Sequence, residues 1–175
     1  MKKNWYVVYT KINCELKVVS HLTKKKIESF CPMNDVPNNT GCKKKWITIP
    51  LFQSIVFVNI SKSEIHFVKQ TNEVFDFFYW LGAPAVISHE EIKNLKCFTN
   101  DYSDMRLEKI PVDQLGATQI TMIPHAGNFI QNVSSKQTFV KMILPSLGYS
   151  IIASVELSMN NVFDLAADFK IRSVL

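Results

Sequence analysis

The chain has 175 residues, of which 47% are hydrophobic and 20% charged, with a net charge of +5. These values describe a globular protein of one ordinary domain or two small ones. No run approaches the roughly 18 apolar residues that a membrane span requires, and no secretion signal precedes the first strand pattern, so we expect a cytoplasmic protein with no membrane partner.

Cysteine spacing argues against a metal centre. Cys14, Cys31, Cys42 and Cys97 form no C-x-x-C pair, the spacing that zinc sites and redox motifs use. We expect reduced, structural thiols and no cofactor.

Positive charge is concentrated in the first quarter of the chain. Residues 1–46 hold ten lysines and three acids, a net of +7, whereas residues 47–175 carry a net of −2. A field of this kind attracts nucleic acid phosphates, although a solvated helix face with a basic loop explains most such charge runs.

The first elements follow from periodicity. Residues 5–10 predict a strand, and Asn13 stands where it would cap a helix. Helical spacing places one apolar side inward, comprising Ile12, Leu16, Val19 and Leu22. The same spacing places Lys17, His21 and Lys24 on an outer basic stripe.

Further strands are predicted over 27–31, stopped by Pro32, and over 46–49 and 55–60, with a turn at 38–41. Ser61 is placed to cap a short helix. Residues 74–80 predict an aromatic strand, and Ser88 with Glu91 forms a capping box before a helix with Ile92 and Leu95 inward. This order predicts an α+β fold with a mainly antiparallel sheet flanked by helices.

Periodicity is lost over 100–114, which predicts a linker. Short β-like runs over 117–123, 129–133, 138–144 and 150–157 then predict a small all-β barrel. The expected organisation is a domain over 1–99, the linker over 100–114, a barrel over 115–160 and a tail over 161–175, whose fold the sequence leaves open.

Three blocks carry a family resemblance: WYVVYTK at 5–11, PLFQSIVFVNI at 50–60 and YWLGAPAVISHEEI at 79–92. Together they resemble the NusG family of transcription elongation factors, whose N-terminal domain binds RNA polymerase. The resemblance implies a NusG-like N-terminal domain and a C-terminal SH3-like KOW barrel. The family's glycine-rich KOW turn is represented at 123–129 only by Gly127, and Gln53 and Ile55 replace its usual proline and aromatic residue.

The segments YWLGAPAVI and LGYSIIASVE look most similar to those of specialised paralogues from Bacteroidetes polysaccharide loci, the UpxY type. This resemblance implies an operon-specific antiterminator that suppresses pausing or termination, with capsular polysaccharide genes as its target. The alternatives are a housekeeping NusG that couples polymerase to Rho or the ribosome and, from another class, an RNA- or ribosome-binding KOW protein.

The resemblance also implies sites. Residues that would take the polymerase clamp helices are Tyr9, Ile55, Phe57, Phe78 and Ile92, and His66 and Phe67 would contact the polymerase gate loop. Lys11, Lys17, His21 and Lys24 would contact the non-template DNA strand. The barrel would bind a ribosomal protein.

Each site has a plainer alternative. Residues 74–80 place aromatic side chains on both faces of the predicted strand, so both faces need to be buried. Helices can bury one face, and a further element of the same chain can bury the other. The barrel or the tail would then mask the polymerase-binding surface; the sequence leaves this open, together with the operon recognised and the oligomeric state.

Catalysis has no support in the sequence. No G-x-S-x-G, P-loop, H-E-x-x-H or dinucleotide motif is present. Cys31 or Cys97 could be paired with His66 or His89 as a nucleophile and base, but isolated residues of these types are usually structural. We therefore expect a protein that is not an enzyme.

Overall fold

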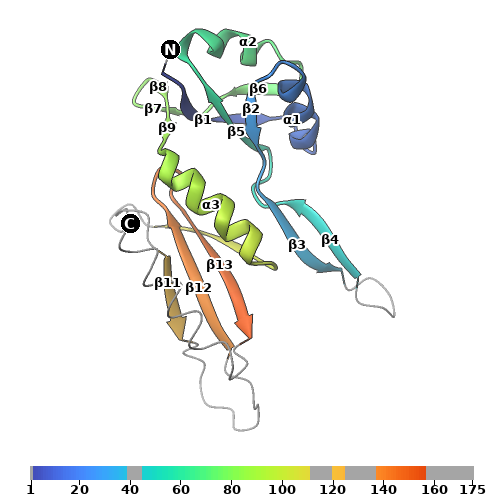
Figure 1. Ribbon diagram of the computed structural model, residues 1–175, viewed down its shortest axis with the longest axis vertical. Helices are drawn as coiled ribbons and strands as arrows, with labels where there is room; N and C mark the ends of the chain where they lie inside the picture. The colour runs from blue at the N-terminus through green and yellow to red at the C-terminus, as the bar shows by residue number, and fades with distance from the viewer. Residues whose placement is uncertain (1, 39–44, 111–119, 125–136, 157–175) are drawn as a thin grey trace.

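A computed structural model describes residues 2–38, 45–110, 120–124 and 137–156 (Figure 1). The N-terminal sheet has the order β2-β5-β1-β6, with β9 also paired to β1. Its strands are β1 (Asn4–Thr10), β2 (Glu28–Phe30), β5 (Ile55–Ile60), β6 (Val74–Phe77) and β9 (Val86–Ile87), and all their pairings are antiparallel. The predicted antiparallel sheet is confirmed.

Side chains alternate between the two faces of this sheet, as strand geometry requires. Tyr6 and Val8 of β1 join one buried cluster with helix α1 (Glu15–Lys24) and helix α2 (Ile65–Lys69). Trp5 and Val7 join a second cluster with helix α3 (His89–Asp101) and the C-terminal strands. The sheet therefore has both faces covered by its own chain.

Helix α1 exists as predicted, and its inward side was predicted correctly for Leu22 and Val19 but not for Ile12 and Leu16. It begins after Cys14, because Asn13 takes a left-handed conformation with φ of 59° instead of capping the helix. The buried residues are Glu15, Val18 and Leu22, while Ile12 is 67% exposed and Leu16 55% exposed. Glu15 is held inside because its carboxylate accepts a 2.6 Å hydrogen bond from the Ser54 N–H.

The region after β5 follows the predicted caps. Ser61 precedes a 3-10 turn (Lys62–Glu64) that leads into α2, and the Glu64 carboxylate accepts from the Ser61 N–H at 2.8 Å. The predicted aromatic strand is interrupted at Phe78, so that β6 is followed by a small hairpin of β7 (Tyr79–Trp80) and β8 (Ala83–Pro84).

The predicted capping box of α3 is formed only in part. The Ser88 hydroxyl accepts from the Glu91 N–H at 3.0 Å. The Glu91 side chain, by contrast, bonds to Ser146 of the C-terminal region. A residue that was predicted to act within its own helix thus joins two parts of the chain.

The C-terminal strands form an antiparallel sheet in the order β10-β13-β12-β11. They are β10 (Arg106–Lys109), β11 (Ile120–Pro124), β12 (Gln137–Leu144) and β13 (Tyr149–Glu156). Strand β10 lies within the segment predicted as a linker, because its backbone pairs with β13 and Leu107 packs against the core. The KOW barrel stays a prediction: most of its turn, the strand predicted over 129–133 and the tail lie outside the described residues.

A two-stranded ribbon projects from the body of the protein (Figure 1). It consists of β3 (Met33–Asn38) and β4 (Lys45–Pro50), paired from Met33 with Pro50 to Asn38 with Lys45. Among the described residues, no helix is long and apolar enough to cross a membrane.

Candidate functional site

Residues expected to contact polymerase gather on one face of the N-terminal sheet. Tyr9 of β1 lies opposite Ile55 of β5, and its ring meets that of Phe78 edge to face at 6.1 Å between centroids. Ile55 and Phe78 are partly buried, and Tyr9 is 37% exposed. The structure therefore brings these three side chains together.

Phe57 and Ile92 belong to the same face but lie beneath its surface. Phe57 is 0% exposed and Ile92 is 2% exposed, and both are members of the core cluster that α3 shares with the sheet. Phe57 packs against Phe30 and Phe52, with ring centroids 6.2 and 6.0 Å away. Core packing occupies both side chains in this structure, so their contact with the clamp helices stays a prediction.

The C-terminal sheet covers this face. The buried apolar side chains of β12 and β13 belong to the same core cluster as those of β1, β5 and α3; they are Val140, Met142, Leu144, Ile151 and Ala153. Tyr149 meets Phe52 edge to face at 6.2 Å. Burial, and secondly the neighbouring Tyr149, raise the pKa of Tyr9. The cover that the aromatic residues require is thus supplied by the chain itself.

Glu91 and Ser146 form the polar contact of this packing. The Glu91 side chain, in a residue 3% exposed, accepts from the Ser146 hydroxyl at 2.6 Å and from the Ser146 N–H at 3.3 Å. Burial raises the pKa of Glu91, and the bonds from Ser146 offset part of that rise. No sequence pattern indicated this contact, because a glutamate at the third position of a helix is explained by capping.

The predicted nucleic-acid residues lie on the first helix and just before it. Lys11, Lys17 and Lys24 are exposed, and His21 is partly exposed. The His21 Nδ1 atom lies 3.1 Å from a carboxylate oxygen of Glu73, so His21 already has a partner. The three lysines are the accessible cations of this stripe.

His66 and Phe67 lie on α2, away from the covered face. Both are exposed, Phe67 at 57%, and their rings lie 6.3 Å apart. His66 Nε2 contacts Gln70 Nε2 at 2.8 Å. The pair is thus presented on the surface, and its contact with a gate loop stays a prediction.

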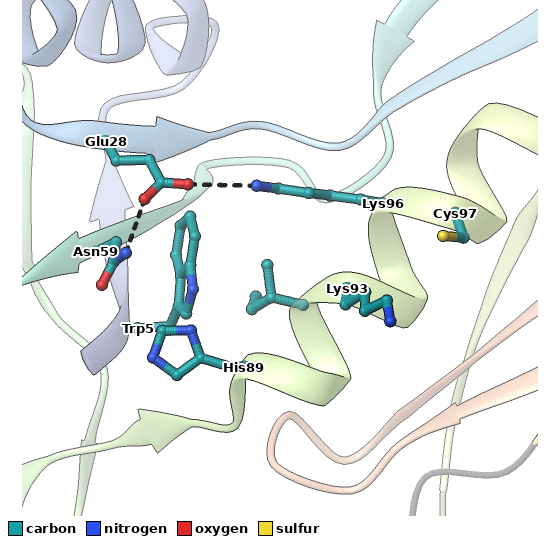
Figure 2. Close-up of a pocket in the computed structure, with 8 residues that line it drawn as sticks. Trp5, Glu28, Asn59, His89, Lys93, Lys96 and Cys97 are labelled. Atoms are coloured by element: carbon teal, nitrogen blue, oxygen red, sulfur yellow. Dashed lines mark hydrogen bonds and ion pairs between the residues drawn. The ribbon is translucent and has the colours of Figure 1, made fainter. Parts of the chain in front are cut away.

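A cavity of about 420 Å³ opens between α3 and strands β1, β2 and β5 of the sheet (Figure 2). Lys96 of α3 lies over the Trp5 ring, 4.9 Å from its centroid, and its Nζ atom is 3.4 Å from a Glu28 carboxylate oxygen. Glu28 also accepts from Asn59 at 2.7 Å. The contacts of Lys96 with Glu28 and Trp5 therefore join α3 to the sheet beside this cavity.

Thiol chemistry has little support in the geometry. Burial raises the pKa of Cys31 to about 11, which keeps it a protonated thiol at neutral pH. Cys14, Cys31 and Cys97 are free thiols. Within the described ranges no three histidine, cysteine, aspartate or glutamate side chains are grouped to hold a metal ion.

Comparison with known proteins decides the family. The family model described as "Transcription termination factor nusG" matches residues 3–96, more than half of the chain. The chain belongs to the NusG family. Members of this family are non-enzymatic transcription factors that bind RNA polymerase. No curated protein matches the chain at a significant level.

A solved structure supports the NusG fold. The structure titled "Domain interaction in Thermotoga maritima NusG" aligns with a TM-score of 0.50 and 18% sequence identity, covering 90% of this chain and 94% of that one. At this identity the likeness concerns the fold alone. In this NusG-family chain, the region matched by the family model includes both the covered face and the basic stripe.

Proposed function

We propose that this chain is an operon-specific antiterminator that binds RNA polymerase through Tyr9, Ile55 and Phe78 and suppresses pausing or termination. The observation that carries the proposal is the convergence of these three side chains on one sheet face. An apolar, aromatic face of this kind suits the apolar side of a helix, which is the contact that clamp helices would make.

The same face is packed against the C-terminal sheet, so polymerase binding requires that sheet to leave. A ligand that binds only an open form has its apparent affinity reduced by the open fraction. The form in which the C-terminal sheet covers this face, here called the closed form, is therefore inactive. An event that releases the C-terminal sheet would activate the factor. Contact of Lys11, Lys17 and Lys24 with the phosphates of the non-template DNA strand would position the factor on that strand, whereas operon selectivity would require contacts with the bases.

The proposal that the factor serves a surface-polysaccharide operon rests on the UpxY-like sequences at 79–87 and 147–156. A housekeeping role with Rho or the ribosome is the competing function within the family. The C-terminal strands, as a KOW-like barrel, would bind a ribosomal protein once released.

Pull-down with core RNA polymerase tests the proposal. Wild type is expected to bind, and Phe78→Asp to lose binding, because a charge would stand at the centre of the apolar face. Phe75→Asp is the matched control, since Phe75 lies on the adjacent strand β6 but is 81% exposed and outside this face. Absence of polymerase binding both by wild type and by a variant opened by Ser146→Asp would refute the proposal.

Readthrough of a terminator placed behind the protein's own operon leader distinguishes the two roles within the family. The antiterminator raises readthrough on this leader and not on an unrelated one. Equal effects on both leaders, or increased Rho-dependent termination, would identify the housekeeping role instead.

A further inference from the structure

The projecting ribbon of β3 and β4, here called the arm, is held rigidly at its base. The Asn34 side chain is 4% exposed, donates to the Met105 carbonyl at 2.9 Å and accepts from the Met105 N–H at 3.0 Å. The Asp104 N–H also donates to the Asp35 carbonyl at 2.7 Å. An isolated two-stranded ribbon is marginally stable in water, so these bonds fix both its fold and its direction.

Beyond its base the arm is uncovered and apolar along β4. Residues Lys45 to Ile49 are all exposed, with Trp46 at 56%, Ile47 at 38% and Ile49 at 40%. The structure describes no element of this chain packed over Trp46. Large exposed side chains on a fixed arm are typical of a contact surface.

Charge indicates what the arm contacts. Residues 33–50 hold the consecutive lysines Lys43, Lys44 and Lys45 and a single acid, Asp35. The carboxylate of Asp35 accepts from the Thr48 hydroxyl, so it is engaged within the arm. A net positive segment that leads directly into an exposed tryptophan combines the two features with which proteins hold unpaired nucleic acid: cations for phosphates and an aromatic ring for base stacking.

We propose that the arm binds single-stranded DNA, with a base stacked on Trp46 and a neighbouring phosphate paired with Lys45. The choice of DNA over RNA rests on the proposed function, in which the factor works beside the melted DNA of an elongating polymerase. The arm is a contact separate from the stripe of Lys11, Lys17 and Lys24, because it lies on different elements. Binding by the arm does not require the C-terminal sheet to leave.

Fluorescence anisotropy of the full chain with a labelled oligo-dT strand tests the proposal. Trp46→Ala is expected to weaken binding by about tenfold, at the low end of what loss of one stacked base costs. Trp80→Ala is the matched control, because Trp80 is 64% exposed on the β7–β8 hairpin, which lacks lysine. Lys45→Ala is expected to lower the slope of log affinity against log salt by about 0.7, the value for one phosphate on a single strand.

Several outcomes would overturn the proposal. They are no binding of oligo-dT by wild type, equal weakening by the two tryptophan substitutions, and tighter binding of the corresponding RNA strand or of duplex DNA. Polymerase pull-down separates this proposal from the proposed function. Trp46→Ala should bind polymerase as wild type does. If oligo-dT is bound, but polymerase is bound neither by wild type nor by the opened variant Ser146→Asp, the proposed function is refuted while the arm proposal is supported.

Discussion

The carboxylate of Glu91, on α3, accepts hydrogen bonds from both the hydroxyl and the N–H of Ser146, which lies between β12 and β13. This pair joins the N-terminal domain to the sheet that covers its aromatic face. The Glu91 side of this pair is buried, since Glu91 is 3% exposed, whereas Ser146 is only partly buried. Removal of the Ser146 hydroxyl therefore leaves a buried carboxylate oxygen poorly satisfied.

Ser146→Ala should weaken the packing of the C-terminal sheet. The hydroxyl bond to a carboxylate is lost while the buried oxygen remains, which costs about 1–3 kcal/mol. Native-state hydrogen exchange of β12 and β13 measures this loss as faster exchange, with the strands of the N-terminal sheet protected as before. Ser154→Ala, at an exposed position of β13, should leave exchange unchanged. Slower or equal exchange in Ser146→Ala would contradict the role of this pair.

Glu91 should make the stability of the closed form depend on pH. Because its pKa in the folded protein is raised above the ordinary 4.5, this carboxyl stabilises the closed form fully below that pH, and the contribution is lost as pH rises through the raised value. Glu64 and Asp76, whose pKa values are lowered by hydrogen bonds, act in the opposite direction at lower pH. These two groups cancel when wild type is compared with Glu91→Gln by urea denaturation. The stability difference should favour wild type increasingly as pH falls from neutral toward 4.5; a flat difference would count against it.

Substitutions at Phe57 and Tyr9 should have different effects, because Phe57 is a core residue and Tyr9 is partly exposed. Phe57→Ala removes a fully buried ring and should lower the free energy of unfolding by about 3–5 kcal/mol. Tyr9→Ala should cost less, because Tyr9 is 37% exposed, yet it should weaken polymerase binding in a protein that remains folded. Urea denaturation and polymerase pull-down on the same preparations distinguish the two effects. Loss of polymerase binding by Phe57→Ala at full stability would restore Phe57 as a contact residue.

Lysines of the first helix should act on recruitment and not on folding. The double variant Lys17→Ala, Lys24→Ala removes two exposed charges, so the free energy of unfolding should change by no more than about 0.5 kcal/mol. Polymerase pull-down should be unchanged, while recruitment to the operon leader, measured by chromatin immunoprecipitation, should fall. Unchanged recruitment would refute the DNA role of the stripe.

Local patterns predicted the N-terminal elements well. Pro32 does stop β2, Ser88 does cap α3, and the blocks at 5–11 and 50–60 do form the central pair β1 and β5. These features depend on residues that are close together in the sequence, so local patterns are enough to predict them. The NusG family was recognisable from the same blocks.

Features that depend on distant residues were missed. Glu15 is buried because Ser54 donates to it, which rotates α1 and exposes Ile12 and Leu16. Strand β10 forms inside the predicted linker because β13 pairs with it. Phe57 is a core residue because the C-terminal sheet and α3 complete one cluster around it. In each case a partner far along the chain decided the outcome.

Affinity for core RNA polymerase in a deliberately opened protein tests the central claim most directly. Ser146→Asp places a second negative charge against Glu91, and like charges in contact cost several kcal/mol, so the C-terminal sheet should be displaced. Polymerase affinity should rise by about tenfold or more over wild type, and Phe78→Asp in the same background should abolish it. Ser154→Asp, on the exposed side of β13, should bind as wild type does. If Ser146→Asp releases the C-terminal sheet, as hydrogen exchange would report, and polymerase still fails to bind, the covered face is not the polymerase-binding site.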